Sequence, residues 1–121
     1  MAVLNSTATA SLSVSQTGNA DSTNTLDRGQ GNVSPGAVLI ASTIGATPTA
    51  TVNILGSVDG TNFYNVPYAL VATPSTFVVA ALTITTAVTT TYLLQRDQEW
   101  RYLKLAYSAN TNVTLTADGY L

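Results

Sequence analysis

The stretch TVNILGSVDGTNFYNV, residues 51–66, constrains the fold of this chain more than any other part of the sequence. Ser57 to Gly60 fit a type I turn, and the glycine can adopt the left-handed conformation that closes a three-residue hairpin loop. A two-residue loop would shift the pairing by one residue and oppose apolar to polar side chains, so we expect the longer loop. Ser57, Asp59 and Gly60 are therefore the expected turn-forming residues. The expected register places Ser57 opposite Thr61, Ile54 opposite Tyr64, Val52 opposite Val66 and Leu55 opposite Phe63.

Short β-strands account for most of the remaining apolar pattern. Apolar and β-branched residues at strand spacing occur in the segments 10–16, 37–43, 77–80, 82–94, 100–108 and 113–121. Gly45 and Pro48 are expected to end the second of these segments, and residues 109–112 to turn the chain before the last one. No helix of useful length is predicted, so the sequence indicates an all-β fold, an antiparallel β-sandwich of about eight strands that is jelly-roll-like or Greek key. Its expected core includes Val38, Ile40, Val52, Ile54, Leu103, Leu105, Val113 and Leu115.

A chain of 121 residues is the size of one domain, so we expect residues 1–121 to form a single β-sandwich domain with a polar N-terminal segment. Residues 17–36 are rich in turn formers and nearly empty of apolar residues, which predicts a long loop. It is expected to be either a surface loop or an arm that contacts a neighbour, and to bury too little apolar surface to order itself. Asp27 and Arg28, the adjacent charges of this segment, are candidate interface residues.

The charge content restricts the partners of this chain. Charged residues make up only 8%, against about 25% in ordinary soluble domains, and the net charge is −2. With only four basic residues, the chain has no basic patch that could bind phosphate backbones or anionic lipid. Neither nucleic acid nor a membrane is therefore an expected partner. The N-terminus lacks the pattern of a signal peptide, and no apolar run approaches the ~20 residues of a membrane-spanning helix. We therefore expect synthesis into a cytoplasm.

Few groups are available for catalysis. The sequence has no histidine and no cysteine, which removes the commonest general base and all thiolate chemistry. Its six carboxylates lie in predicted loops, in turns or in the last strand, without the pattern of a calcium loop or of a glycosidase pair. We expect no catalytic residue, no cofactor and no metal, and hence a protein that is not an enzyme.

The segment WRYLKLAYS, residues 100–108, supplies the other interface candidates. If Leu103 and Leu105 point into the core, strand alternation places Trp100 and Tyr102 on the opposite face. There they are either covered by the second layer of the sandwich or presented to a partner, a position that suits aromatic residues. The charge cluster at 96–99 is expected to be a solvated turn.

GSVDGTNFYNV followed by WRYLKLAYS resembles the β-sandwich capsid decoration, or cement, proteins of tailed phages, and more weakly the second half of discoidin-type domains. The matching positions are Ser57, Asp59, Gly60, Phe63 and Arg101–Leu105. The first resemblance implies a virion structural protein, made in the host cytoplasm, that binds the major capsid protein on the capsid exterior and stabilises the shell without catalysis. A homo-oligomer is expected, with a trimer favoured. The second resemblance implies, as an alternative, a carbohydrate-binding or host-attachment module with a glycan ligand.

Overall fold

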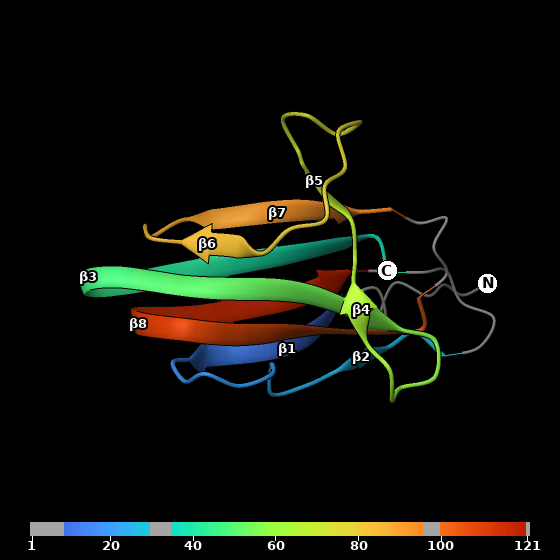
Figure 1. The fold of residues 1–121 in the computed structure, drawn as a ribbon, viewed down its shortest axis with the longest axis horizontal. Helices are drawn as coiled ribbons and strands as arrows, with labels where there is room; N and C mark the ends of the chain where they lie inside the picture. The colour runs from blue at the N-terminus through green and yellow to red at the C-terminus, as the bar shows by residue number, and fades with distance from the viewer. Residues whose placement is uncertain (1–8, 30–34, 96–99, 121) are drawn as a thin grey trace.

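The computed structural model describes residues 9–29, 35–95 and 100–120 (Figure 1). Within these ranges the chain forms eight β-strands, all paired antiparallel, and no helix. The all-β antiparallel fold predicted from the sequence is confirmed. The N-terminal segment 1–8, the middle of the predicted loop at 30–34 and the charge cluster at 96–99 lie outside the described residues. The strands are β1 (Thr9–Gln16), β2 (Leu26–Asp27), β3 (Ala37–Ser57), β4 (Tyr64–Asn65), β5 (Tyr68–Leu70), β6 (Leu82–Ile84), β7 (Thr89–Leu94) and β8 (Tyr102–Tyr120).

Two long strands, β3 and β8, pair along nearly their whole lengths and form a ribbon through the molecule. Ala37–Ile44 pair with Val113–Tyr120, and Thr51–Ser57 pair with Tyr102–Ser108. In Figure 1 each strand runs to one end of the molecule and returns, β3 from teal to green and β8 from orange to dark red. The ribbon is thus folded over on itself, and its two halves lie in two layers. One layer adds β1, β7 and β5, and the other adds β2, β4 and β6.

The bends of this ribbon differ from the sequence prediction, which ended one strand at Gly45 and Pro48 and turned the chain at residues 109–112. Both strands continue through their bends, because the two bends coincide and the pairing resumes beyond them with shifted register. Thr47 has a φ of 45°, and Asn112 has a φ of 53°, so the turns take left-handed backbone. The Asn112 side chain donates a hydrogen bond to the carbonyl of Ala46 at 2.6 Å, which ties the two bends together.

The hairpin after β3 is also longer than predicted. Gly56 lies opposite Tyr64, a register two residues away from the predicted one, and the pairing of β3 with β4 covers only two residues. The reason is the carboxylate of Asp59, which accepts hydrogen bonds from the backbone N–H of Thr61 at 2.8 Å and of Asn62 at 2.9 Å and so extends the loop beyond Gly60. A shift of two residues keeps the parity of the pairing, so Tyr64 and Asn65 stay on their predicted faces.

The core lies between the two layers and forms one cluster. All eight residues that alternation placed in the core are buried, which confirms that prediction. The segment 82–94 divides into β6 and β7 on either side of the turn expected near Thr86. The segment 77–80 contributes an isolated bridge between Val78 and Tyr68 in place of the expected strand.

Part of the predicted loop or arm at 17–36 packs on the sheet, where Leu26–Asp27 form β2 and Asp21 makes an isolated bridge to Ala106. The backbone N–H of Ser22 donates to the carbonyl of Leu105 at 2.7 Å, and Leu26 lies opposite Leu103. Leu26 is buried in the core cluster. The first half of β8 pairs with β3 along one edge, and its other edge is open. The segment around β2 satisfies backbone groups at that open edge and adds Leu26 to the core.

Gly56 tests the packing at the end of the core. A Cβ at this position would lie 2.7 Å from Cδ2 of Trp100 and 2.8 Å from Cγ2 of Val66, so Gly56→Ala overpacks the site. We expect a loss of about 1–3 kcal/mol in the free energy of unfolding, measured by chemical denaturation. Gly18→Ala is the matched control, because no atom lies within 4 Å of the place its methyl group would take. Equal midpoints for the two variants would contradict this packing.

Leu26→Ala tests whether the 20–28 segment is part of the folded domain. Removal of a buried leucine side chain typically costs about 2–5 kcal/mol of unfolding free energy, and the same loss is expected here. The neighbouring Thr25 is exposed, so Thr25→Ala should leave stability nearly unchanged. If Leu26→Ala melts like the parent protein in a thermal scan, the segment does not contribute to the core.

Candidate functional site

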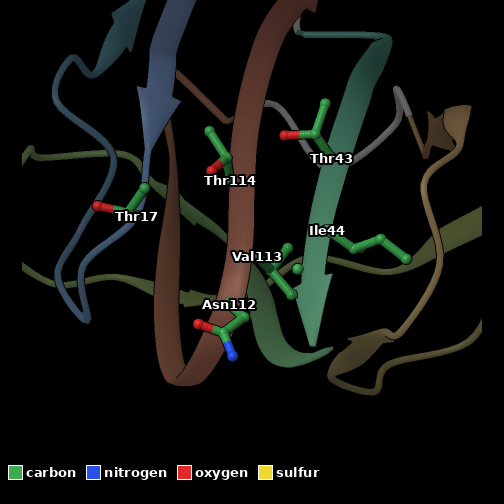
Figure 2. A pocket seen from close by; sticks show the side chains of 7 residues that line it. Thr17, Thr43, Ile44, Asn112, Val113 and Thr114 are labelled. Carbon is green, nitrogen blue, oxygen red and sulfur yellow. The ribbon is translucent and has the colours of Figure 1, made fainter. Parts of the chain in front are cut away.

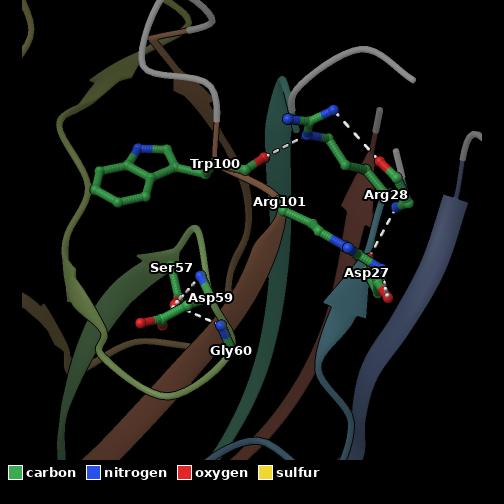
Figure 3. Close-up of polar contacts among 8 residues, drawn as sticks. Asp27, Arg28, Ser57, Asp59, Gly60, Trp100 and Arg101 are labelled. Carbon is green, nitrogen blue, oxygen red and sulfur yellow. Dashed lines mark hydrogen bonds and ion pairs between the residues drawn. The ribbon is translucent and has the colours of Figure 1, made fainter. Parts of the chain in front are cut away.

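The four residues predicted as interface candidates gather at one end of the sandwich (Figure 3). Asp27 lies in β2 directly opposite Tyr102, the first residue of β8. The backbone N–H of Arg28 donates to the carbonyl of Arg101 at 3.0 Å, and its Nε donates to the carbonyl of Trp100 at 2.8 Å. We call these five residues, Arg101 included, the β2–β8 cluster. The structure therefore brings residues from two parts of the chain together at this end of the molecule.

Arg101 is the member of this cluster that the sequence prediction missed. Its Nε donates to Asp27 Oδ1 at 2.8 Å, and its Nη2 donates to Asp27 Oδ2 at 3.3 Å. This pairing, with the backbone N–H of Gly29, holds the pKa of Asp27 below its usual value. The Arg101 guanidinium also lies 5.0 Å from the centre of the Tyr102 ring. Since 74 residues separate the two ends of this ion pair, no local pattern could have indicated it.

Trp100 does not follow the alternation that was used to place it. It precedes β8, and its indole packs against Gly56 and Val66 beside the core instead of on the face opposite Leu103 and Leu105. Its ring centre is 6.5 Å from that of Tyr64. The indole Nε1 is buried and has no hydrogen-bond partner among the described residues. Trp100 thus closes one end of the core, so its removal is expected to cost folding stability.

The turn after β3 is built by the three predicted turn-forming residues (Figure 3). The Ser57 hydroxyl oxygen accepts from the N–H of Gly60 at 2.9 Å, and Gly60 has a φ of 79°. Asp59 accepts from the backbone of Asn62 and Thr61, from the Asn62 side chain and from the Ser57 hydroxyl. These bonds, above all the two from backbone N–H groups, hold the pKa of Asp59 far below its ordinary value. The carboxylate is committed to the turn.

A hollow of about 450 Å³ lies between this turn and the β2–β8 cluster. Phe63 and Tyr102 give it aromatic surface, and Lys104 places its Nζ 4.0 Å from the centre of the Phe63 ring. Lys104 also forms an ion pair with Asp21 at 2.8 Å. The hollow therefore combines aromatic rings with both signs of charge, which suits a polar ligand or a side chain of a partner protein. Its lining is Thr25, Asp27, Asp59, Gly60, Phe63, Tyr102 and Lys104.

A second hollow, of about 410 Å³, lies at the opposite end, where the ribbon bends (Figure 2). Its walls are Thr17 from the end of β1, Thr43 and Ile44 from β3, and Asn112 and Thr114 from β8. Figure 2 shows hydroxyl and amide groups around it, and its lining carries no charged side chain.

Neither a metal site nor a membrane-spanning helix occurs in the part of the chain that the structure describes. No three or more aspartate or glutamate side chains there are grouped so that they could hold a metal ion. No helix in these ranges is long and apolar enough to cross a membrane.

The fold resembles that of one solved protein over nearly the whole chain. The crystal structure of the SPBc2 prophage-derived protein YomS matches with a TM-score of 0.61, covering 93% of this chain and 91% of that one. The two sequences are only 7% identical, so the likeness concerns the fold. No protein-family model matches the sequence. No curated protein matches it either.

Asp59→Asn tests the carboxylate of the turn. The substitution keeps the size of the side chain but removes the charge that favours four hydrogen bonds, so we expect a lower melting temperature near neutral pH. Because folding lowers the pKa of Asp59, its stabilising effect is complete above the unfolded value near ~3.9 and is lost as pH falls toward the folded value. The difference from the parent protein should therefore be constant above about pH 5 and shrink between about pH 4 and about pH 2. Asp118→Asn, outside the turn, is the control, and a pH-independent difference would contradict the assigned role.

Proposed function

We propose that this protein is a structural protein of a bacteriophage particle, a decoration protein that binds the outside of the capsid shell and stabilises it without catalysis. The observation that carries the proposal is the likeness in fold, over 93% of the chain, to a protein derived from a prophage. The resemblance of the hairpin and of the WRYLKLAYS strand to capsid decoration proteins supports it independently. In this function the partner is the major capsid protein, and the protein works as a homotrimer on the virion after synthesis in the host cytoplasm.

The folded-over ribbon suits a protein that reinforces a shell. Its two strands, of 21 and 19 residues, run the length of the molecule and satisfy each other's backbone groups along most of it. The hydrogen bonds between the two strands are interrupted only at the bend, so each half of the ribbon is a continuously paired, extended segment. The surface is poor in charge and rich in hydroxyl groups, so contact with neighbours desolvates fewer charges than it would on an ordinary protein surface.

We assign contact with the shell to the β2–β8 cluster and the hollow beside it. Tyrosine and arginine are enriched at protein interfaces, and Tyr102 and Arg101 are both partly exposed here. Arg101 is held by Asp27, and the Tyr102 ring lies beside Gly60 of the turn, so both side chains are positioned before a partner arrives. Preorganised side chains lose less conformational entropy on binding.

Binding to isolated shells tests this function. The purified protein should sediment with capsid shells that lack it and raise the temperature at which they disassemble. Tyr102→Ala should weaken this binding at least tenfold, equivalent to about 1.4 kcal/mol, while the variant stays folded. Val14→Ala, at a side chain 70% exposed on β1, is the control and should bind like the parent protein. Failure of the parent protein to bind any shell would refute the proposal.

A discoidin-like glycan-binding module is the second candidate, and the hollow of about 450 Å³ favours it specifically. Aromatic rings beside carboxylates are the groups with which proteins bind sugars, by stacking and by hydrogen bonds to hydroxyls. Here Lys104 lies over one face of Phe63 and Arg101 over one face of Tyr102, so each ring has one face occupied by a cation. Binding to a glycan panel that is lost in Tyr102→Ala, without affinity for shells, would establish this function instead.

A further inference from the structure

Asp59 and Gly60 form one of two Asp-Gly pairs in this chain, and the other is Asp118 with Gly119. Asp-Gly is the aspartate sequence most prone to isomerise, because glycine has no side chain to keep its backbone nitrogen away from the carboxyl group. Asp118 and Gly119 lie within β8, which pairs there with β1 on one side and with β3 on the other. Asp59 and Gly60 lie in the exposed turn, beyond the last pair of β3 with β8. Their protection has to come from the turn itself.

The isomerisation proceeds through a cyclic imide. The glycine nitrogen loses its proton and bonds to Cγ of the aspartic acid, while the carboxyl hydroxyl leaves as water and a succinimide is formed. Water then adds to one of the two ring carbonyls and breaks the bond of that carbon to the nitrogen. Opening at the α-carbonyl gives isoaspartate, whose main chain runs through Cβ and Cγ. One water is released and one is consumed, so the reaction needs no other reactant.

The turn engages the nucleophile of this reaction (Figure 3). The N–H of Gly60 donates to Ser57 Oγ at 2.9 Å, and the N–H of Asp59 donates to the same oxygen at 3.2 Å. The Ser57 hydroxyl donates its own proton to Asp59 Oδ1 at 2.9 Å, so it uses its donor and both of its acceptor positions. Ser57 is fully buried. To attack Cγ, the Gly60 nitrogen must first give up its bond to this fixed oxygen.

The turn also keeps the carboxyl group in its unreactive form. Asp59 Oδ1 accepts from the backbone N–H groups of Asn62 and Thr61, at 2.9 and 2.8 Å, and Oδ2 accepts from the Asn62 amide at 2.9 Å. These bonds, with that from Ser57, favour the carboxylate and hold the pKa of Asp59 far below its ordinary value. The ring closes on the protonated acid, which can lose water. At neutral pH the protonated fraction falls about tenfold for each unit by which the pKa is lowered.

We propose that the Ser57–Asp59 turn suppresses a spontaneous modification, the isomerisation of Asp59 to isoaspartate, to which the exposed Asp59–Gly60 pair is otherwise liable. Ser57 is the positioning residue, because its hydroxyl contacts both the attacking nitrogen and the carboxyl group that this nitrogen would attack. Isoaspartate lengthens the main chain and carries its carboxylate on Cα. The hydrogen bonds that now close the turn could not all form around it.

The inference rests on the proposed function only for its consequence. The chemistry concerns this chain alone and needs no partner. A phage particle makes no new protein, so a decoration protein has to keep its turn for as long as the particle lasts. Asp59 and Gly60 line the hollow to which we assign contact with the shell, so isomerisation would weaken shell binding as particles age.

Isoaspartate at both Asp-Gly pairs of the full chain tests the inference. The protein is stored for several weeks at neutral pH, either folded or unfolded in guanidinium chloride, and is then digested. Mass spectrometry with electron-transfer fragmentation measures isoaspartate at each position. In the folded parent protein, Asp59 should isomerise slower than in the unfolded chain by about tenfold or more.

Ser57→Ala removes the shared oxygen and should raise the rate at Asp59 in the folded protein by about fivefold or more. The rate at Asp118 in the same digest should stay at the parent value, since it rises only if the whole chain unfolds. Asn62→Ala, at an exposed position, removes one donor to the carboxylate and should raise the rate at Asp59 by a smaller factor. Thr61→Ala is the matched control, because Thr61 contributes its backbone N–H and the substitution retains it.

Equal rates at Asp59 in the folded and the unfolded parent protein would overturn the inference. So would a Ser57→Ala variant that isomerises no faster than Thr61→Ala. If Ser57→Ala raises the rates at Asp59 and Asp118 together, the variant unfolds and Asn62→Ala decides, since an unchanged rate at Asp59 then refutes the inference. Shell binding of the same stored samples separates the two proposals. A protected Asp59 in a protein that binds no shell leaves the inference standing while the proposed function fails, and shell binding by a protein with an unprotected Asp59 does the reverse.

Discussion

The pairing of β3 with β8 is the interaction on which the rest of this structure depends. Every other strand pairs with one of these two or, in the case of β5, with β7, which itself pairs with β3. The fold-over of the ribbon turns one pair of strands into two layers and brings alternate residues of both halves to face each other. The core, the open edge that β2 covers and the end that Trp100 closes all follow from this single arrangement.

The sequence patterns were sufficient for the fold class and for the core, because the alternation of apolar residues depends only on strand geometry. Val38, Leu105 and Leu115 could be placed in this way without knowledge of their partners. The bends could not be predicted in this way. Gly45 and Pro48 are locally typical of strand ends, and the pairing continues past them only because the partner strand bends at the same place. The predicted hairpin register was wrong for a similar reason. The hydrogen bonds between Asp59 and the backbone of Thr61 and Asn62 lengthen the loop, and turn preferences do not include these bonds.

The candidate site was predictable in its members but not in its geometry. Asp27, Arg28, Trp100 and Tyr102 were singled out from two distant stretches, and the structure joins them through backbone pairing of β2 with β8. Arg101 was missed because its partner is remote in sequence, and Trp100 was misplaced because alternation was extended to a residue before the strand begins.

The long-range pairing of β3 also governs how the chain reaches its native state during synthesis. β3 is complete at Ser57, but the strand that pairs with it along most of its length begins at Tyr102 and ends at Tyr120. A nascent chain therefore emerges from the ribosome with a 21-residue strand, and the edge of this strand that pairs with β8 has no native partner until β8 has been made. Folding dominated by such distant contacts is slow, and unpaired edges are prone to aggregate.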